Sequence, residues 1–141
     1  MTKKSVLILC TGNSARSQMG EGLFRAAAGD TYDVYSAGTH PGVVRPEAVA
    51  VLAEIGIDIS GQRSKSLDEF TGRGFTYVIT VCDHAAELCP AFLSADRPGA
   101  TQRLHWPFED PAGPNEPEEV RFASFRKVRD RIKAKIADFL K

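Results

Sequence analysis

The sequence predicts an α/β fold: a single domain of three layers, in which a central, mostly parallel four-stranded sheet is flanked by helices. Short apolar or β-branched runs alternate along the chain with longer segments whose apolar residues recur at three- and four-residue steps. The chain has 141 residues, which is enough for one hydrophobic core and short for two. We therefore expect one domain over residues 1–141.

The first half of the chain is expected to form two strand–helix pairs. Residues 5–9 are an apolar run typical of a buried central strand, and residues 18–28 place apolar side chains at helical spacing. A second strand is expected at 32–37, where the run ends in small and turn-forming residues. The second helix is expected at 46–55, because the segment starts on a proline and stops before Gly56.

The second half repeats the pattern and closes with a helix. A short helix is expected at 67–71, a β-branched buried strand at 75–81 and a last, short strand at 104–106. A loop rich in proline and glycine follows at 107–117. Apolar residues at helical spacing over 120–139 then predict a long amphipathic helix that packs on the sheet, and we give that stripe a structural role only.

Composition narrows the class of protein. Eighteen basic and eighteen acidic residues balance, so electrostatics gives no support to binding of nucleic acid or of a membrane surface. No apolar run approaches the ~20 residues of a membrane span, and the first residues lack a secretory signal pattern, so we expect a cytoplasmic protein. Three cysteines in a reducing compartment favour catalytic or redox use over a disulfide framework.

One segment carries the strongest functional signal. The expected first strand ends at Cys10, a short loop follows, and the next helix begins within a few residues. Backbone N–H groups of such a loop and the positive end of the helix form a cradle for a tetrahedral anion over the sulfur. The same field lowers the pKa of the thiol, so Cys10 can attack as a thiolate. The residues expected to bind the oxyanion are Thr11, Gly12, Asn13, Ser14, Ala15, Arg16 and Ser17.

Each position in this loop suits a separate task. Arg16 offers a planar fork of donors that matches two oxygens of phosphate or arsenate, and Ser17 can donate its hydroxyl to the Cys10 sulfur. Gly12 allows a close approach of the anion, while Asn13 tolerates a left-handed conformation and can brace the loop. The alternative is an ordinary strand-to-helix turn with a buried cysteine. The spacing Cys-x5-Arg-Ser at the end of a strand favours anion chemistry.

The loop 10–17 resembles the active-site loop of low-molecular-weight protein tyrosine phosphatases and of the thioredoxin-coupled arsenate reductases built on the same fold. The segment 81–90 is similar to the redox segment of the reductases, and 105–113 is similar to their general-acid loop. The resemblance covers essentially the whole chain. It implies a low-molecular-weight phosphatase-like fold and an arsenate reductase that acts in arsenic detoxification. The implied catalytic residues are Cys10, Cys82, Cys89, Arg16 and Asp110.

The second and third cysteines support the reductase branch. Cys82 and Cys89 are separated by six residues, too far for a Cys-x-x-Cys turn and without the paired spacing of a zinc site. A lone His84 between them is more often a surface group than a ligand. The resemblance implies that Cys10, Cys82 and Cys89 pass a disulfide along in turn and that thioredoxin, or a glutaredoxin, then reduces it. Their Cα atoms must come within about 7 Å for each pairing, so the segment between the last two has to move.

The proposed acid, Asp110, has a competing interpretation. An Asp-Pro pair is commonly the start of a turn. Its place in the loop after the last expected strand, and its match to the acid of the family, favour protonation of the leaving hydroxide.

The loop has expected supporting residues outside the motif. Some relatives bind potassium through residues that match Asn13, Glu21, Ser36 and an aspartate, but the position of that aspartate corresponds to Lys65 here. An ammonium group at Lys65 can replace the cation and pair with Glu21, so we expect no metal and no cofactor. A solvated surface charge is the alternative for Lys65. Ala15 stands where some relatives carry a cysteine, which should protect Cys10 from a local disulfide.

Two other functions stay open at this point. A low-molecular-weight protein tyrosine phosphatase needs only Cys10, Arg16 and Asp110, but it has no use for Cys82 and Cys89. A non-catalytic redox sensor or oxyanion-binding module would use the cysteines but leaves Arg16 and Asp110 with less to do.

Overall fold

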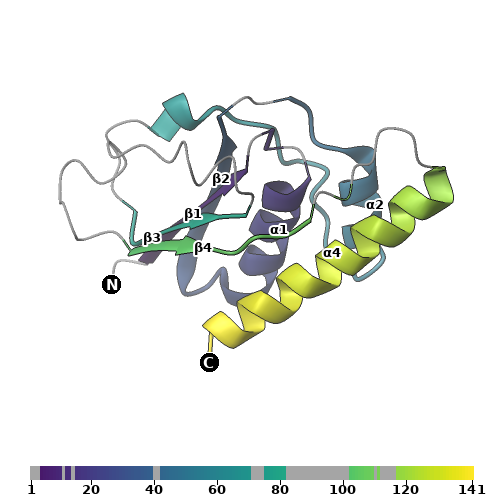
Figure 1. The fold of residues 1–141 in the computed structure, drawn as a ribbon. Coiled ribbons are helices and arrows are strands. Elements are labelled where there is room, and N and C mark those ends of the chain that lie inside the picture. Colours follow the sequence, from purple (N-terminus) through teal and green to yellow (C-terminus); the bar gives the residue numbers. More distant parts are fainter. Residues whose placement is uncertain are drawn as a thin grey trace.

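We analysed a computed structural model of the chain, which describes residues 4–10, 12–13, 15–39, 42–70, 75–81, 102–109, 111 and 117–141. The helices and strands of the described part, in chain order, are β1 (Lys4–Cys10), α1 (Arg16–Ala28), β2 (Tyr32–Gly38), α2 (Pro46–Ala53), the 3₁₀ helix η1 (Leu67–Phe70), β3 (Tyr77–Thr80), β4 (Gln102–His105) and α4 (Glu118–Phe139). Strands and helices alternate as the sequence predicts (Figure 1).

The four strands form one parallel sheet in the order β2-β1-β3-β4. The register pairs Cys10 with Gly38 on one side of β1 and Leu9 with Thr80 on the other, while Thr80 pairs with His105 on β4. The carboxyl ends of all four strands therefore meet at one edge of the sheet. In parallel α/β sheets this is the edge where ligand sites are found, and Cys10 lies on it.

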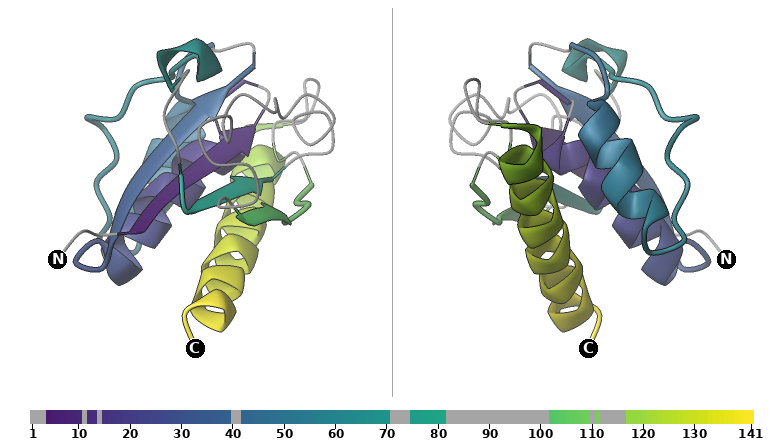
Figure 2. Two further views of the ribbon diagram at one scale, coloured as in Figure 1. Left: turned by 90° about the vertical axis from the view of Figure 1, so that its left-hand side faces the viewer. Right: turned by 90° about the vertical axis from the view of Figure 1, so that its right-hand side faces the viewer.

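Helices α1, α2 and α4 pack against one another on one face of the sheet (Figure 2). Ile8 of β1 and Ile132 of α4 both face Gly20 of α1, so strand, short helix and long helix meet at this point. The buried apolar residues of α4 are Phe125, Val128, Ile132 and Ile136. The predicted stripe is thus confirmed as core from Phe125 onward, whereas Val120 at the start of the helix is 45% exposed.

The opposite face of the sheet is also covered. Leu7 and Leu9 alternate with Ile8 along β1, and all three are at most 2% exposed. An aromatic cluster of Tyr35, Phe70 and Phe75 joins β2, η1 and the start of β3 by edge contacts with ring centroids 5.7–5.9 Å apart. Edge-to-face rings of this kind suit the quadrupoles of the aromatic systems. The three-layer prediction is confirmed.

The predicted boundaries shift by one or two residues at most described ends. Two strands differ most: β3 spans Tyr77–Thr80 rather than 75–81, and the last strand, β4, spans Gln102–His105 rather than 104–106. The shift of β4 has a backbone cause. Its ladder starts where Gln102 N–H donates to the Thr76 carbonyl at 3.0 Å, a backbone bond that no apolar pattern signals. Helix α1 begins at Arg16 rather than at residue 18. Within the described ranges, no helix combines the length and the apolar character that crossing a bilayer requires.

Candidate active site

Cys10 is the last residue of the central strand β1 and is 4% exposed. Helix α1 starts six positions later at Arg16, so the strand and the helix are joined by the short connection that the sequence predicts. Of the predicted cradle, Gly12, Asn13, Ala15, Arg16 and Ser17 belong to the described residues. Thr11 and Ser14 lie outside them. The sheet edge and the start of α1 therefore meet at the predicted nucleophile.

Asn13 is the brace of this connection. Its φ of 47° is left-handed, as predicted for this position, and its side chain is fully buried. The Nδ2 group donates to Ser17 Oγ at 2.8 Å and to Ser36 Oγ at 3.0 Å. The Oδ1 atom accepts from the backbone N–H of Lys65 at 2.7 Å. The cost of a left-handed asparagine is thus balanced by hydrogen bonds to three separate segments of the chain.

Two loops hold the connection from outside. The Gly12 carbonyl accepts from the backbone N–H of Gly42 at 3.0 Å and from the Ser64 hydroxyl at 3.0 Å. These contacts tie residues 42–45 and 62–66 to the loop after Cys10. A backbone held on both sides is preorganised, as an anion cradle must be if it is not to spend binding energy on its own ordering.

Glu21 of α1 is a buried carboxylate beneath this brace. Ser36 Oγ donates to its Oε1, Arg25 lies 2.8 Å from its Oε2, and the ammonium of Lys65 lies 3.4 Å from its Oε1. The predicted Lys65–Glu21 pair is therefore present. The Lys65 side chain is only 12% exposed, so the alternative of a solvated surface charge is wrong. Among the described residues, no cluster of three or more His, Cys, Asp or Glu side chains could hold a metal ion.

Arg16 joins the cradle to the loop after β4. Its Nη1 donates to the Phe108 carbonyl at 3.0 Å, across 92 positions of sequence. That loop is held in turn by Trp106 N–H to the Thr80 carbonyl at 2.8 Å and by Phe108 N–H to the Val81 carbonyl at 3.2 Å. The segment that leads to Asp110 therefore contacts the arginine that we expect to bind the anion.

The remaining predicted catalytic residues, Cys82, Cys89 and Asp110, lie outside the described residues, as does His84. The residues that precede Cys82 and Asp110 in sequence belong to the described part of the chain. Val81 N–H donates to the Leu9 carbonyl at 2.9 Å, so the residue before Cys82 is hydrogen bonded to the residue before Cys10. Glu109, the residue before Asp110, is 3.2 Å from Arg131 and 3.5 Å from Lys127 of α4.

The structure adds residues that the sequence did not single out. Gln18 is fully buried on α1, and its amide contacts both Asn13 and the Arg63 carbonyl. Gln62 donates in turn to Gln18. A polar residue on the buried face of a helix is the feature of the sequence that could have pointed to Gln18. The spacing of apolar residues cannot show which loop such a residue contacts.

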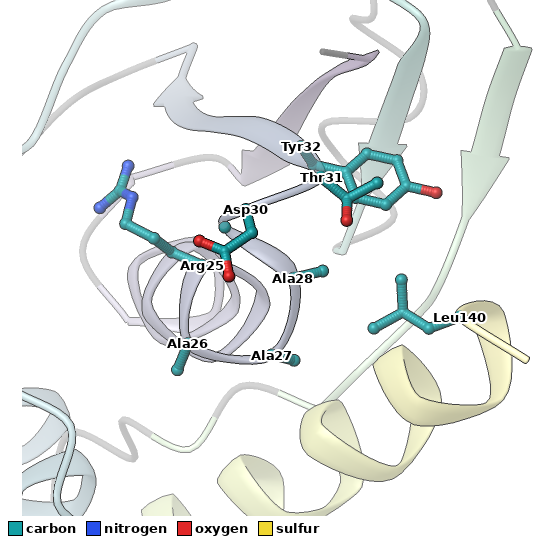
Figure 3. A pocket seen from close by; sticks show the side chains of 9 residues that line it. Arg25, Ala26, Ala27, Ala28, Asp30, Thr31, Tyr32 and Leu140 are labelled. Atoms are coloured by element: carbon teal, nitrogen blue, oxygen red, sulfur yellow. The ribbon is translucent and has the colours of Figure 1, made fainter.

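One cavity of about 440 Å³ lies away from this site, between the end of α1, the start of β2 and the end of α4 (Figure 3). Asp30 and Thr31 place oxygen atoms at it, while Tyr32 and Leu140 give it an apolar wall. It sits at the amino ends of the strands, whereas Cys10 is at a carboxyl end. It therefore adds nothing to the anion site.

A family model described as low molecular weight phosphotyrosine protein phosphatase matches residues 5–141. The chain belongs to this family. Within the low molecular weight phosphatase family, curated relatives similar to the chain are named arsenate reductase. One from Halalkalibacterium halodurans is 46% identical over 139 residues, 99% of this chain and 96% of the relative. Another from Bacillus subtilis is 41% identical over 139 residues, which are also 99% of this chain and 96% of the relative.

Solved structures of the family agree with this placement. An arsenate reductase in the phosphate binding state has a TM-score of 0.78 at 31% identity and covers 96% of this chain and 95% of its own. A thioredoxin-dependent arsenate reductase from Corynebacterium glutamicum has a TM-score of 0.75 at 26% identity, over 98% of this chain and 60% of its own. A low molecular weight protein tyrosine phosphatase from T. tengcongensis scores 0.74 at 29% identity, over 98% of both chains.

Proposed function

We propose that this protein is an arsenate reductase that converts arsenate to arsenite. The observation that carries the proposal is similarity over almost the whole chain to proteins named arsenate reductase, at 46% identity for the Halalkalibacterium relative. The geometry supports it, because a buried Cys10 ends the central strand directly before a braced loop and Arg16. The whole of residues 1–141 then acts as one catalytic domain.

The first step forms an adduct. The Cys10 thiolate attacks arsenic(V), a sulfur–arsenic bond forms, and one oxygen leaves as hydroxide that Asp110 protonates to water. The Arg16 fork and the loop N–H groups hold the remaining oxygens. The Ser17 oxygen already accepts from Asn13, which leaves its own hydrogen to donate to the sulfur as the sequence predicts.

The second step moves the electrons. The Cys82 thiolate attacks the Cys10 sulfur, the sulfur–arsenic bond breaks, and its electron pair reduces arsenic(V) to arsenic(III), which leaves as arsenite. A Cys10–Cys82 disulfide remains. The hydrogen bond between Val81 and Leu9 supports this pairing, because it holds together the two residues that directly precede Cys82 and Cys10.

The third step frees the nucleophile. Cys89 attacks Cys82, a Cys82–Cys89 disulfide forms, and Cys10 is released as a thiolate. We propose that the dithiol of thioredoxin, with glutaredoxin as the alternative, reduces this disulfide. Disulfide geometry requires the segment between the two cysteines to rearrange between the pairings.

Lys65 supports the loop in place of a bound cation. Its ammonium neutralises Glu21 beneath Asn13 and Ser36, at the position where the family resemblance implies potassium in some relatives. We therefore propose that the reaction needs neither a metal nor a cofactor, and that the protein works in the cytoplasm. Strong activation by potassium but not by sodium contradicts the role of Lys65.

A phosphatase activity is the second candidate, because the T. tengcongensis phosphatase has a similar fold and that chemistry needs only Cys10, Arg16 and Asp110. Phosphorus(V) is not reduced by thiols, so a phosphoester stops at the first stage. We expect phosphatase turnover to be weak.

The deciding experiment follows arsenate-dependent oxidation of NADPH with thioredoxin and thioredoxin reductase, repeated with glutaredoxin. Cys82→Ser is expected to abolish arsenate turnover and to spare any hydrolysis of p-nitrophenyl phosphate. Hydrolysis without arsenate turnover in the unchanged protein supports a phosphatase. The absence of both activities supports a sensor. Mass spectrometry of Cys89→Ser trapped during turnover should find the Cys10–Cys82 disulfide.

A further inference from the structure

We propose that Gln18, held in place by Gln62, is a positioning residue that sets the conformation of the oxyanion cradle through Asn13. The inference rests on the proposed function only in that the loop after Cys10 binds an oxyanion. Gln18 lies on the first turn of α1, is fully buried and points its amide back at the loop instead of into an apolar core.

The contacts of Gln18 converge on the brace. Its Nε2 donates to Asn13 Oδ1 at 2.9 Å, to the Asn13 carbonyl at 3.0 Å and to the Arg63 carbonyl at 2.9 Å. One amide group thus touches both the side chain and the backbone of the left-handed residue. It also ties that residue to the loop whose Lys65 N–H meets the same Oδ1.

The orientations of the side-chain amides of Asn13, Gln18 and Gln62 follow from backbone groups that can only donate or only accept a hydrogen bond. Lys65 N–H can only donate, so the oxygen of Asn13 must face it and the nitrogen must face Ser17 and Ser36. The Arg63 carbonyl can only accept, so Gln18 must present its nitrogen there.

The oxygen of Gln18 then faces Gln62. Gln62 Nε2 donates to Gln18 Oε1 at 2.6 Å and to the Gln18 carbonyl at 3.2 Å. Since Gln18 Oε1 can only accept, Gln62 must act as a donor. Turning over Gln18 or Gln62 would place oxygen against oxygen, and turning over Asn13 would place its amide nitrogen against the Lys65 N–H and the Gln18 amide nitrogen.

This arrangement requires a side chain with an N–H donor at both Gln18 and Gln62. A carboxylate at either place has the same size but no N–H, so it sets an oxygen against the carbonyls or amide oxygen that now accept. At Gln18, which is fully buried, water does not relieve that repulsion. Gln62 is partly exposed and its Oε1 accepts from Arg25 Nη1 at 3.4 Å, so the repulsion there is weaker. The repulsion displaces Asn13. This shifts the loop N–H groups and changes the electrostatic field that acts on the Cys10 thiol.

The test measures binding of inorganic phosphate by calorimetry and the pH dependence of Cys10 alkylation by iodoacetamide, in a Cys82→Ser, Cys89→Ser background with one remaining thiol. Gln62→Glu is expected to weaken phosphate binding roughly 3- to 10-fold, the equivalent of one net hydrogen bond, and to move the alkylation profile to higher pH. Gln18→Glu is expected to do both more strongly. Gln102→Glu, the same change on the exposed strand β4, is the matched control and should change neither.

A comparison of Gln62→Glu with Gln62→Lys separates the loss of hydrogen-bond donation from a change in packing. Gln62→Lys keeps donors at that position and should lose less phosphate affinity than Gln62→Glu. Equal losses in the two variants, or cooperative folding of Gln62→Glu with unaltered phosphate affinity and alkylation profile, overturn the proposal. If Gln18→Glu does not fold, the Gln62 pair still decides. Both readouts are independent of arsenate reduction, so absence of turnover in the unchanged protein refutes the proposed function and leaves this test intact.

Discussion

Two glycines of helix α1 differ sharply in the room around them. A methyl group added at Gly22 would lie 2.5 Å from Ile59 Cγ2 and 3.1 Å from Leu52 Cδ1, and both of these side chains are at most 1% exposed. A methyl group at Gly20 would meet Ile8 Cδ1 at 3.4 Å, an ordinary contact. Gly22→Ala and Gly20→Ala are therefore the same change in the same helix, with opposite consequences for packing.

The magnitudes follow from that difference. Replacing glycine by alanine inside a helix gains about 1 kcal/mol of helix propensity, which Gly20→Ala should largely keep. Overpacking against pinned side chains costs about 1–3 kcal/mol, and the 2.5 Å contact places Gly22→Ala in the upper half of that range. We expect Gly22→Ala to lose about 1–2 kcal/mol of unfolding free energy net and Gly20→Ala to gain about 0.5–1 kcal/mol.

Urea unfolding followed by circular dichroism measures both free energies, and thermal unfolding should separate the two midpoints by several degrees. The clash also has a functional readout. Ile59 accepts a backbone hydrogen bond from Gln62, so displacement of Ile59 should reach the glutamines behind Asn13 and weaken phosphate binding in Gly22→Ala alone. A Gly22→Ala protein at least as stable as Gly20→Ala refutes the close approach of the 57–62 segment to α1.

Three further predictions concern charge. Lys65→Met leaves Glu21 buried with Arg25 as its remaining cation, so we expect a loss of about 1–3 kcal/mol in urea unfolding. Potassium chloride should restore more of this loss than sodium chloride, and no loss in either salt contradicts the pairing. Burial raises the pKa of Glu47, but a backbone hydrogen bond and the side chains of Arg45 and Arg121 together lower it below its usual value of 4.5. A lowered folded pKa stabilises the native state above about pH 4.5, and this contribution is lost as the pH falls through the folded value. The stability advantage of the unchanged protein over Glu47→Gln should therefore shrink below that pH, and a constant difference from pH 7 to pH 3 argues against the ion pair. Arg16→Lys keeps the charge but loses the fork, so calorimetry should find phosphate bound roughly 10-fold or more weakly with little change in melting temperature. Unchanged affinity removes Arg16 from the cradle.

Much of this structure follows from patterns that a single sequence carries. Short apolar or β-branched runs predict the strands, because both faces of the sheet are buried, and three-to-four spacing predicts the helices, because burial of one face imposes that spacing. Cys10, Asn13 and Arg16 are recognisable since a nucleophile, a left-handed residue and an anion fork each restrict the residue type. Lys65 paired with Glu21 is also predicted, and the structure confirms it at 3.4 Å.

Other features depend on contacts that leave no pattern. The bond from Arg16 ends on the carbonyl of Phe108, and any residue at that position presents the same group. Gln18 resembles a routine polar helix position until the loop at Arg63 is folded against it. The edge strand β4 is polar at Gln102, so backbone pairing and not hydrophobicity decides where it starts.

The hydrogen bond from Arg16 to Phe108 has a mechanical consequence. A guanidinium carries five N–H groups in a rigid plane, enough to keep one peptide carbonyl while offering two parallel donors to an incoming oxyanion. The same planar group then fixes the distance between the bound substrate and the loop that carries the proton donor. Insertion or deletion of a residue between Trp106 and Asp110 should thus alter the grip on the anion as well as the delivery of the proton, although that stretch is remote from Cys10 along the chain.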